Sequence, residues 1–211
     1  MCWRLSSSIS STEPHTSSLN WYLNTNPQQI DLEQALAQVS EQRRTYALRY
    51  RKVSDQRLSV AVWLLLQQAL RDEFGIEEPP VFHYTETGKP LLCGHDDIHF
   101  NLSHCDNAVA CAVGRNPVGI DVESIDRYSP ELLPVTMSKT EQQQILAAPC
   151  PEVVFIRLWT MKESLLKCTG EGLSDHLPTL LADTSSYRFQ TLTTPHCICT
   201  LCETIKGKNQ Y

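Results

Sequence analysis

The chain has 211 residues, of which 41% are hydrophobic, and its formal net charge is −6. This length and apolar content suffice for one large domain or two small ones, each with a packed core. The acidic balance argues against general nucleic-acid binding, which normally requires a basic surface.

The first 18 residues contain a serine-rich stretch from Ser6 to Ser18, and we expect them to be disordered. They lack the apolar core of a secretory signal, so we do not expect export. Farther along, the longest apolar run covers residues 60–66. It is far shorter than the roughly 20 residues needed to cross a bilayer, so we predict a buried helix face and no membrane span.

The rest of the first half, residues 19–114, predicts a strand, two helices and three strands. A strand at 19–23 is followed by a helix from Asp31, a candidate N-cap, to about residue 50. The second helix has Ser54 as its candidate N-cap and Gly75 near its end. The three strands are predicted at residues 81–84, 98–102 and 108–113.

The second half, residues 115–211, repeats this order. A strand is predicted at 118–122, helices at 139–146 and 151–167, and strands at 177–181, 187–192 and 197–201. Pro151 suits a first helical position, and Gly170 suits a helix C-cap. Two similar α+β halves joined at residues 115–117 would form a cleft, and clefts between domains are common ligand sites.

The nine cysteines are odd in number and irregularly spaced. Without an export signal, this pattern argues against a disulfide framework and favours a reducing cytoplasm. One cluster, His196, Cys197, Cys199 and Cys202, has two interpretations: a metal site, or a C-terminal strand that uses cysteine as a small hydrophobic residue. The strand is favoured, because closed zinc sites usually need two separated ligand pairs.

Basic residues gather between positions 43 and 57, where the chain has Arg43, Arg44, Arg49, Arg51, Lys52 and Arg57. This patch is either a solvated helix face or a surface that binds phosphates or an acidic partner. Both interpretations stay open.

Two segments, residues 119–123 and 159–167, carry the candidate chemistry. Asp121 and Glu123 lie two positions apart in a predicted strand, so they face the same way and can share a cation. Glu163 and Lys167 lie one turn apart on one helix face. With Lys162 the segments supply three carboxylates and two ammonium groups, a set suited to Mg²⁺-assisted chemistry on a phosphate ester. Each pair alone also fits a solvated strand edge or a surface ion pair.

Four motifs occur in a characteristic order: Gly88-Lys89-Pro90, Phe100-Asn101-Leu102-Ser103-His104, residues 119–123, and residues 155–167 followed by Gly170-Glu171-Gly172-Leu173. The ordered set resembles the signature of the 4′-phosphopantetheinyl transferases, of the monomeric surfactin-synthetase-activating type. The resemblance extends from about Arg43 to Leu173.

The resemblance implies a fold and an activity. The fold would be a pseudo-twofold pair of α+β halves with coenzyme A and Mg²⁺ in the cleft between them. The enzyme would transfer the phosphopantetheine arm to a serine of an apo acyl or peptidyl carrier protein and release adenosine 3′,5′-bisphosphate. It would act as a monomer.

The resemblance also assigns residues. The implied metal ligands are Asp121, Glu123 and Glu163, and Lys167 matches the lysine near the pyrophosphate. The implied coenzyme A contacts are Arg57, Lys89, Ser103 and His104. His104 also fits a purely structural role.

The chemistry itself suggests a base. The carrier serine must lose its proton as it attacks the β-phosphorus, and Glu163, directly or through water, is the best-placed acceptor. Mg²⁺ and Lys167 would counter the developing negative charge. Two alternatives remain: a magnesium-dependent phosphoesterase acting on coenzyme A-like pyrophosphates, and a non-catalytic module that binds carrier proteins through the basic patch.

Overall fold

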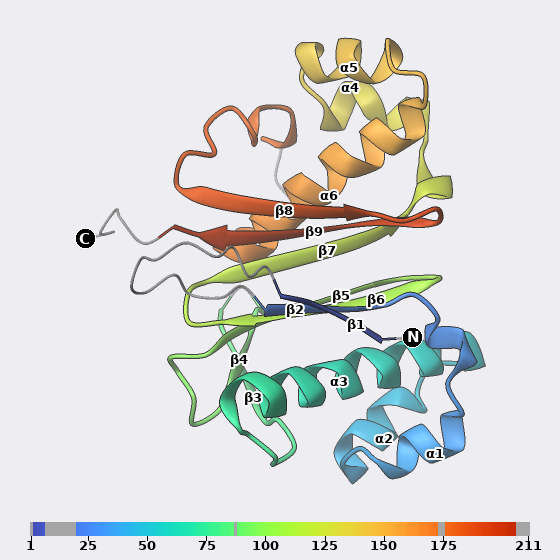
Figure 1. The fold of residues 1–211 in the computed structure, drawn as a ribbon, viewed down its shortest axis with the longest axis vertical. Helices are drawn as coiled ribbons and strands as arrows, with labels where there is room; N and C mark the ends of the chain where they lie inside the picture. The colour runs from blue at the N-terminus through green and yellow to red at the C-terminus, as the bar shows by residue number, and fades with distance from the viewer. Residues whose placement is uncertain (1, 7–19, 87, 173–175, 206–211) are drawn as a thin grey trace.

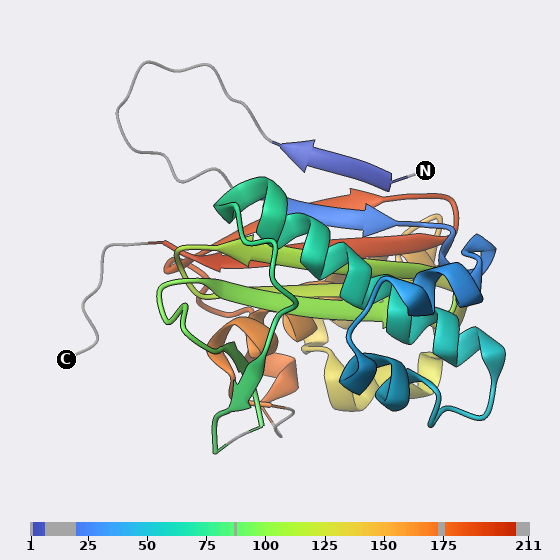
Figure 2. The ribbon, with the colours of Figure 1, turned by 90° about the horizontal axis from the view of Figure 1, so that it is seen from below.

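The first half is an antiparallel sheet covered by one long helix. The computed structural model describes residues 2–6, 20–86, 88–172 and 176–205 (Figure 1). The sheet has the strand order β1-β2-β6-β5 and comprises β1 (Cys2–Ser6), β2 (Asn20–Asn24), β6 (Ala108–Gly114) and β5 (His99–Cys105). Helix α3 (Val53–Phe74) lies across one face of this sheet, and Figure 2 shows it in front of the strands.

The second half contains a smaller antiparallel sheet, which is also covered by a long helix. Its strand order is β7-β9-β8, formed by β7 (Val118–Ser124), β9 (Cys197–Thr204) and β8 (Tyr187–Thr193). The long helix α6 (Pro151–Thr169) covers the face of this sheet that points away from the first half (Figure 1). In the first sheet β6 lies between β2 and β5, and in the second sheet β9 lies between β7 and β8. In each case the central strand is the last of the three in the chain.

The two sheets pack against each other through apolar side chains. Strands β2 and β6 contribute Trp21, Leu23, Ala108, Ala110 and Ala112, and strands β7 and β9 contribute Val118, Ile120, Val122, Cys197, Cys199 and Leu201. Alternate residues of β7 face the other way, toward α6, because side chains alternate along a strand. Asp121 and Glu123 belong to that second set, so packing of the sheets fixes the direction in which the acids point.

Shorter elements complete each half. In the first they are η1 (Pro27–Gln29), α1 (Leu32–Ala37), α2 (Glu41–Ala47) and a separate hairpin of β3 (Phe82–Tyr84) with β4 (Pro90–Leu92). In the second they are η2 (Ile125–Arg127), η3 (Pro130–Leu132), α4 (Leu133–Thr136), α5 (Lys139–Leu146) and η4 (Leu177–Thr179). The α+β class predicted from the sequence is confirmed.

Several predicted helix ends are confirmed by their caps. The Asp31 side chain accepts a hydrogen bond from the Gln34 N–H, and Gly75 and Gly170 end α3 and α6 with φ of 68° and 80°. Pro151 begins α6. Such left-handed caps favour glycine because they place a Cβ in a strained position.

Other predictions are wrong in detail. The helix expected up to residue 50 is split, because Ser40 caps a new helix by accepting from the Arg43 N–H. Ser54 lies inside α3, whose N-cap is Lys52. The strand expected at 177–181 is instead the 3₁₀ turn η4, which contains Pro178, a residue that cannot donate to a sheet.

The N-terminal prediction differs from the structure at one segment. Residues Cys2–Ser6 were expected to be disordered but pair with β2 as strand β1. The remainder of that prediction, residue 1 and residues 7–18, lies outside the described residues. Among the helices that are described, none is long and apolar enough to span a membrane.

The C-terminal cysteines form part of the core. Cys197, Cys199 and Cys202 are buried in β9, and burial raises the pKa of the Cys197 and Cys199 thiols. The eight cysteines whose side chains are described are all free. The interpretation of this segment as a strand with cysteine as a small hydrophobic residue is confirmed.

Candidate active site

Asp121 lies at the centre of a polar network that joins both halves. Its side chain is buried, and Oδ1 accepts hydrogen bonds from Lys167 Nζ at 2.6 Å and Ser103 Oγ at 3.0 Å. Lys167 comes from α6, and Ser103 comes from β5 in the first half. Lys167 Nζ also donates to Ser103 Oγ at 3.1 Å and to the Ile120 carbonyl at 3.3 Å. All three ammonium protons are thus directed at this network.

Side chains of β5 form hydrogen bonds to the backbone of β7 and join the two strands. Asn101 Oδ1 accepts from the Ile120 N–H at 2.9 Å, and Ser103 Oγ accepts from the Val122 N–H at 3.2 Å. These bonds connect the first sheet to the strand that carries the acids. Asn101 belongs to one of the four sequence motifs. Its contact with β7 depends on how the two sheets pack, so the sequence alone does not predict it.

The other two acids share an electrostatic environment with Asp121. Burial raises the pKa of Glu123 to about 7, and the charges of Asp121 and Glu163 add to this effect. Burial also raises the pKa of Glu163, with a further contribution from Asp121. Mutual repulsion of this kind requires the carboxylates to lie near one another. The charges of the three predicted acids thus influence one another, although strand and helix are about forty residues apart in sequence.

The donor chemistry at this site suits Mg²⁺. Asp121 Oδ2 is buried without a hydrogen-bond partner, and a cation would relieve both this oxygen and the repulsion among three carboxylates. As the side chains stand, no group of three histidine, cysteine, aspartate or glutamate residues in the described ranges is arranged to hold a metal ion. The metal ligands Asp121, Glu123 and Glu163 stay a prediction.

A pocket of about 220 Å³ opens beside the network. Residues from both halves line it: Gly88, Lys89, Pro90 and Asn101 from the first, and Glu163, Leu166, Lys167, Gly170 and Gly172 from the second. Three of the four sequence motifs meet here. The glycines in the lining leave space for a ligand, and the two lysines supply positive charge that favours an anionic one.

Lys89 reaches from the first half to the end of α6. Its Nζ donates to the carbonyls of Lys167 at 2.8 Å and Cys168 at 3.0 Å, where a cation is favourable because the helix C-terminus is partly negative. Burial lowers the pKa of Lys89. The lysine predicted to contact coenzyme A thus also connects the two sides of the pocket.

The other two predicted coenzyme A contacts, His104 and Arg57, are not among the residues that line the pocket. His104 follows Ser103 on β5 with an exposed side chain. Arg57 lies in α3 with its Nε buried and unpaired. Within the described residues, no hydrogen bond or ion pair joins Arg57 to the acids, so its assignment to the site stays a prediction.

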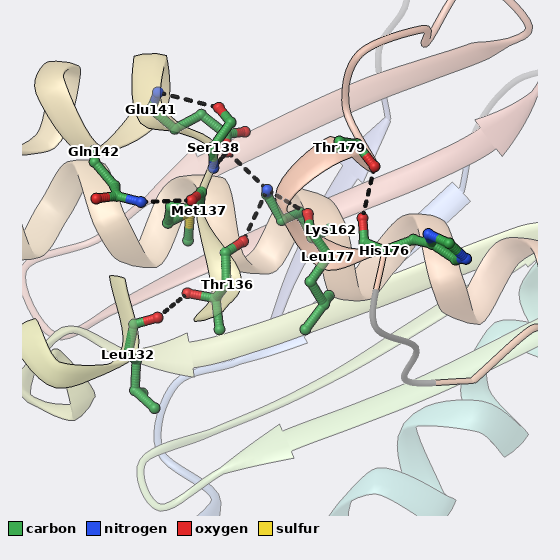
Figure 3. A network of polar contacts seen from close by, with 10 residues as sticks. All are labelled: Leu132, Thr136, Met137, Ser138, Glu141, Gln142, Lys162, His176, Leu177 and Thr179. Carbon is green, nitrogen blue, oxygen red and sulfur yellow. Dashed lines mark hydrogen bonds and ion pairs between the residues drawn. The ribbon is translucent and has the colours of Figure 1, made fainter. Parts of the chain in front are cut away.

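Lys162 does not belong to the charged set at the pocket. Its side chain is fully buried, and its ammonium binds Glu141 and two backbone carbonyls (Figure 3). The interpretation of Lys162 as a second ammonium for phosphate chemistry is wrong, because its side chain is fully buried and does not line the pocket, whereas that of Lys167 does.

Gly119 is a residue whose importance the sequence analysis missed. A Cβ at this position would lie 2.0 Å from the Ser164 carbonyl oxygen and 2.4 Å from the Cys168 backbone nitrogen. Only glycine lets α6 approach β7 this closely, and that approach brings Lys167 to Asp121. A glycine inside a predicted strand is the signal that could have indicated it.

The raised pKa of Glu123 predicts a pH-dependent stability. A carboxyl with a folded pKa of about 7, above its ordinary value of 4.5, stabilises the folded protein at low pH, and this contribution is lost as pH rises toward 7. We expect Glu123→Gln to raise the unfolding temperature in metal-free buffer at about pH 8, and less at about pH 5. Thermal unfolding at both pH values tests this. Glu77→Gln, an exposed surface change, is the control, and equal effects of Glu123→Gln at both pH values would contradict the assignment.

Comparison with known proteins identifies the class to which this site belongs. The family model described as "4′-phosphopantetheinyl transferase superfamily" matches residues 117–210, and the one described as "4′-phosphopantetheinyl transferase, N-terminal" matches residues 23–115. The chain belongs to the 4′-phosphopantetheinyl transferase superfamily.

Individual relatives carry the same name. The chain is 33% identical to the 4′-phosphopantetheinyl transferase psf-1 of Bacillus pumilus, over 78% of this chain and 72% of the relative. It is 32% identical to 4′-phosphopantetheinyl transferase Sfp of Bacillus subtilis strain 168, over 69% of this chain and 66% of the relative. It is 35% identical to 4′-phosphopantetheinyl transferase gsp of Aneurinibacillus migulanus, over 64% of this chain and 57% of the relative.

Proposed function

We propose that this chain transfers the 4′-phosphopantetheine arm of coenzyme A to a serine of an apo carrier protein, with release of adenosine 3′,5′-bisphosphate and a requirement for Mg²⁺. Membership of the superfamily supports the reaction. The observation that carries the proposal for these residues is the buried contact of Lys167 with Asp121 and Ser103, beside a pocket lined from both halves.

The proposal includes two structurally similar halves, residues 19–114 and 115–211, related by a pseudo-twofold axis. The matching strand orders β2-β6-β5 and β7-β9-β8 support it. The two family matches, which end at residue 115 and begin at residue 117, fit the same boundary. The free buried thiols of Cys111 and Cys199 are consistent with a reducing cytoplasm, where we propose that the protein acts as a monomer.

Coenzyme A is proposed to occupy the pocket between the halves. Lys89, Ser103, His104 and Arg57 are its proposed contacts, with the glycines at the rim allowing close approach. Asp121, Glu123 and Glu163 would hold Mg²⁺, which when bound supplies positive charge beside the pyrophosphate oxygens. The orphaned Asp121 Oδ2 supports this assignment.

The chain's own groups have separate functions in the proposed mechanism. As the serine oxygen bonds to the β-phosphorus, the bond from that phosphorus to the bridging oxygen breaks and charge collects on the leaving bisphosphate. Lys167, fixed by three acceptors, is placed to stabilise that charge. Glu163, whose pKa is raised by burial, is the proposed acceptor of the serine proton, because a raised pKa makes a carboxylate a better base.

Product analysis with and without acceptor tests the reaction class. We expect adenosine 3′,5′-bisphosphate to appear only when coenzyme A, Mg²⁺ and an apo carrier protein are all present. Release of this product from coenzyme A without an acceptor would show that the chain is a phosphoesterase and not a transferase. Carrier binding without coenzyme A binding, measured by calorimetry, would instead support a non-catalytic module.

The basic patch predicts how carrier binding responds to salt. Arg43 and Arg44 are committed within the fold, since they bond to Ser59 and to the Leu36 carbonyl, whereas Arg49, Arg51 and Lys52 are exposed. We expect the KM for an acidic carrier to rise as NaCl increases from about 50 to about 500 mM, because exposed charges are screened. Steady-state kinetics of Arg49→Gln and Arg51→Gln should show a weaker dependence. A carrier KM indifferent to salt would contradict docking through this patch.

A further inference from the structure

The fully buried Lys162 occupies a complete cage of oxygen atoms. Its Nζ donates to the Glu141 carboxylate at 2.8 Å, the Thr136 carbonyl at 3.0 Å and the Leu177 carbonyl at 2.7 Å (Figure 3). Lysine is almost never fully buried unless paired, and here each of its three donors has an acceptor. Removing a lysine and a glutamate from water costs free energy, so apolar residues of similar size in their place would leave the fold equally stable or more stable.

The three acceptors lie in three separate segments of the chain. Thr136 ends α4, Glu141 lies in the first turn of α5, and Leu177 begins η4. The Glu141 carboxylate oxygen that binds Lys162 also accepts from the Ser138 N–H at 2.7 Å, which caps α5. One ammonium therefore fixes all three segments to α6.

One of the elements that this ammonium connects, α6, also lines the proposed coenzyme A pocket. Lys162 immediately precedes Glu163 on α6, and Glu163, Leu166 and Lys167 form one side of the pocket. Gly170 and Gly172, which follow α6 directly, form another side. The Leu177 contact is thus a direct bond between the helix turn that carries Glu163 and the segment that follows the helix.

Resting on the proposed function, we infer that Lys162 is a positioning residue for coenzyme A: it holds the turn of α6 that carries Glu163 against α4, α5 and η4, and thereby fixes one wall of the pocket. Lys162 does not contact the ligand in this account. It acts through Glu163, which follows it in α6 and lines the pocket.

The test compares two variants. In Lys162→Met with Glu141→Gln, the cage is removed without leaving a buried carboxylate unpaired. In Glu141→Gln alone, Lys162 retains its bonds to the Thr136 and Leu177 carbonyls. Calorimetric titration with coenzyme A, with and without Mg²⁺, is carried out at about 15 °C below each unfolding midpoint, so that all proteins are folded.

We expect the double variant to bind coenzyme A about tenfold more weakly than wild type, with a matching rise in KM and a smaller change in kcat. Glu141→Gln should unfold at a lower temperature yet keep its affinity within about twofold. Unchanged affinity in the folded double variant would overturn the inference and leave only a structural role for Lys162.

A measurement on wild-type protein decides the case if the double variant does not fold. Backbone amide hydrogen exchange is followed with and without coenzyme A. The inference predicts that the ligand slows exchange at Leu180 and Ala182, whose amides bond within the segment fixed by Leu177, as well as at the pocket. Slowing confined to the pocket would overturn it. If wild type binds no coenzyme A at all, the proposed function fails, and the inference with it.

Discussion

Replacing Asp121 with asparagine is expected to lower turnover by about 10²–10³-fold, the usual cost of losing a preorganised electrostatic group. The substitution keeps the size of the side chain but removes the negative charge that positions Lys167 at 2.6 Å. It also removes a buried oxygen proposed as a metal ligand. Initial rates of phosphopantetheine transfer measure the effect.

The fold should survive this change, because it also relieves repulsion with Glu123 and Glu163. The unfolding temperature is measured alongside the rate to show this. Asp96→Asn, an exposed change in the turn before β5, is the matched control and should retain wild-type activity. Turnover of Asp121→Asn within about threefold of wild type would remove Asp121 from the mechanism.

Replacing Gly119 with alanine is expected to destabilise the protein by about 3 kcal/mol, at the upper end of the cost of overpacking. The new methyl group would meet the Ser164 carbonyl at 2.0 Å and the Cys168 nitrogen at 2.4 Å. Both are backbone atoms of a helix, so no side-chain rotation relieves the contact. The helix must move, and Glu163 and Lys167 move with it.

Urea unfolding measures this loss, and the chain offers a matched control. A Cβ at Gly114, the last residue of strand β6, would lie 3.4 Å from Val118 Cγ1 and 3.7 Å from the Asn116 carbonyl oxygen. These are ordinary contacts, so Gly114→Ala should change stability by less than about 1 kcal/mol. Equal stabilities for the two variants would show that α6 does not depend on Gly119 for its place.

Local patterns in the sequence predict the elements that carry the site. Asp121 and Glu123 share a face because side chains alternate along a strand, and Glu163 and Lys167 share one because they lie one helical turn apart. Capping residues such as Asp31 and Gly170 set helix ends for equally local reasons. Such signals depend on neighbours in the chain, which is why they succeed without a structure.

Contacts between distant segments could not be predicted in this way. Nothing near Ser103 in the sequence indicates that it donates to Asp121, since that bond depends on how the two sheets pack. Lys162 and Lys167 have the same residue type in the same helix, yet one is enclosed by a structural cage and the other contacts the acids. The difference arises from which segments cover each side of α6.

The intact mass of a carrier protein tests the proposed transfer reaction most directly. A panel of apo acyl and peptidyl carrier proteins is incubated with the chain, coenzyme A and Mg²⁺. We predict that at least one gains the mass of a single phosphopantetheinyl group, that removal of coenzyme A or Mg²⁺ prevents the gain, and that Asp121→Asn reduces it. Carrier proteins that all keep their apo mass, under conditions where a transferase such as Sfp of Bacillus subtilis modifies them, would contradict the account.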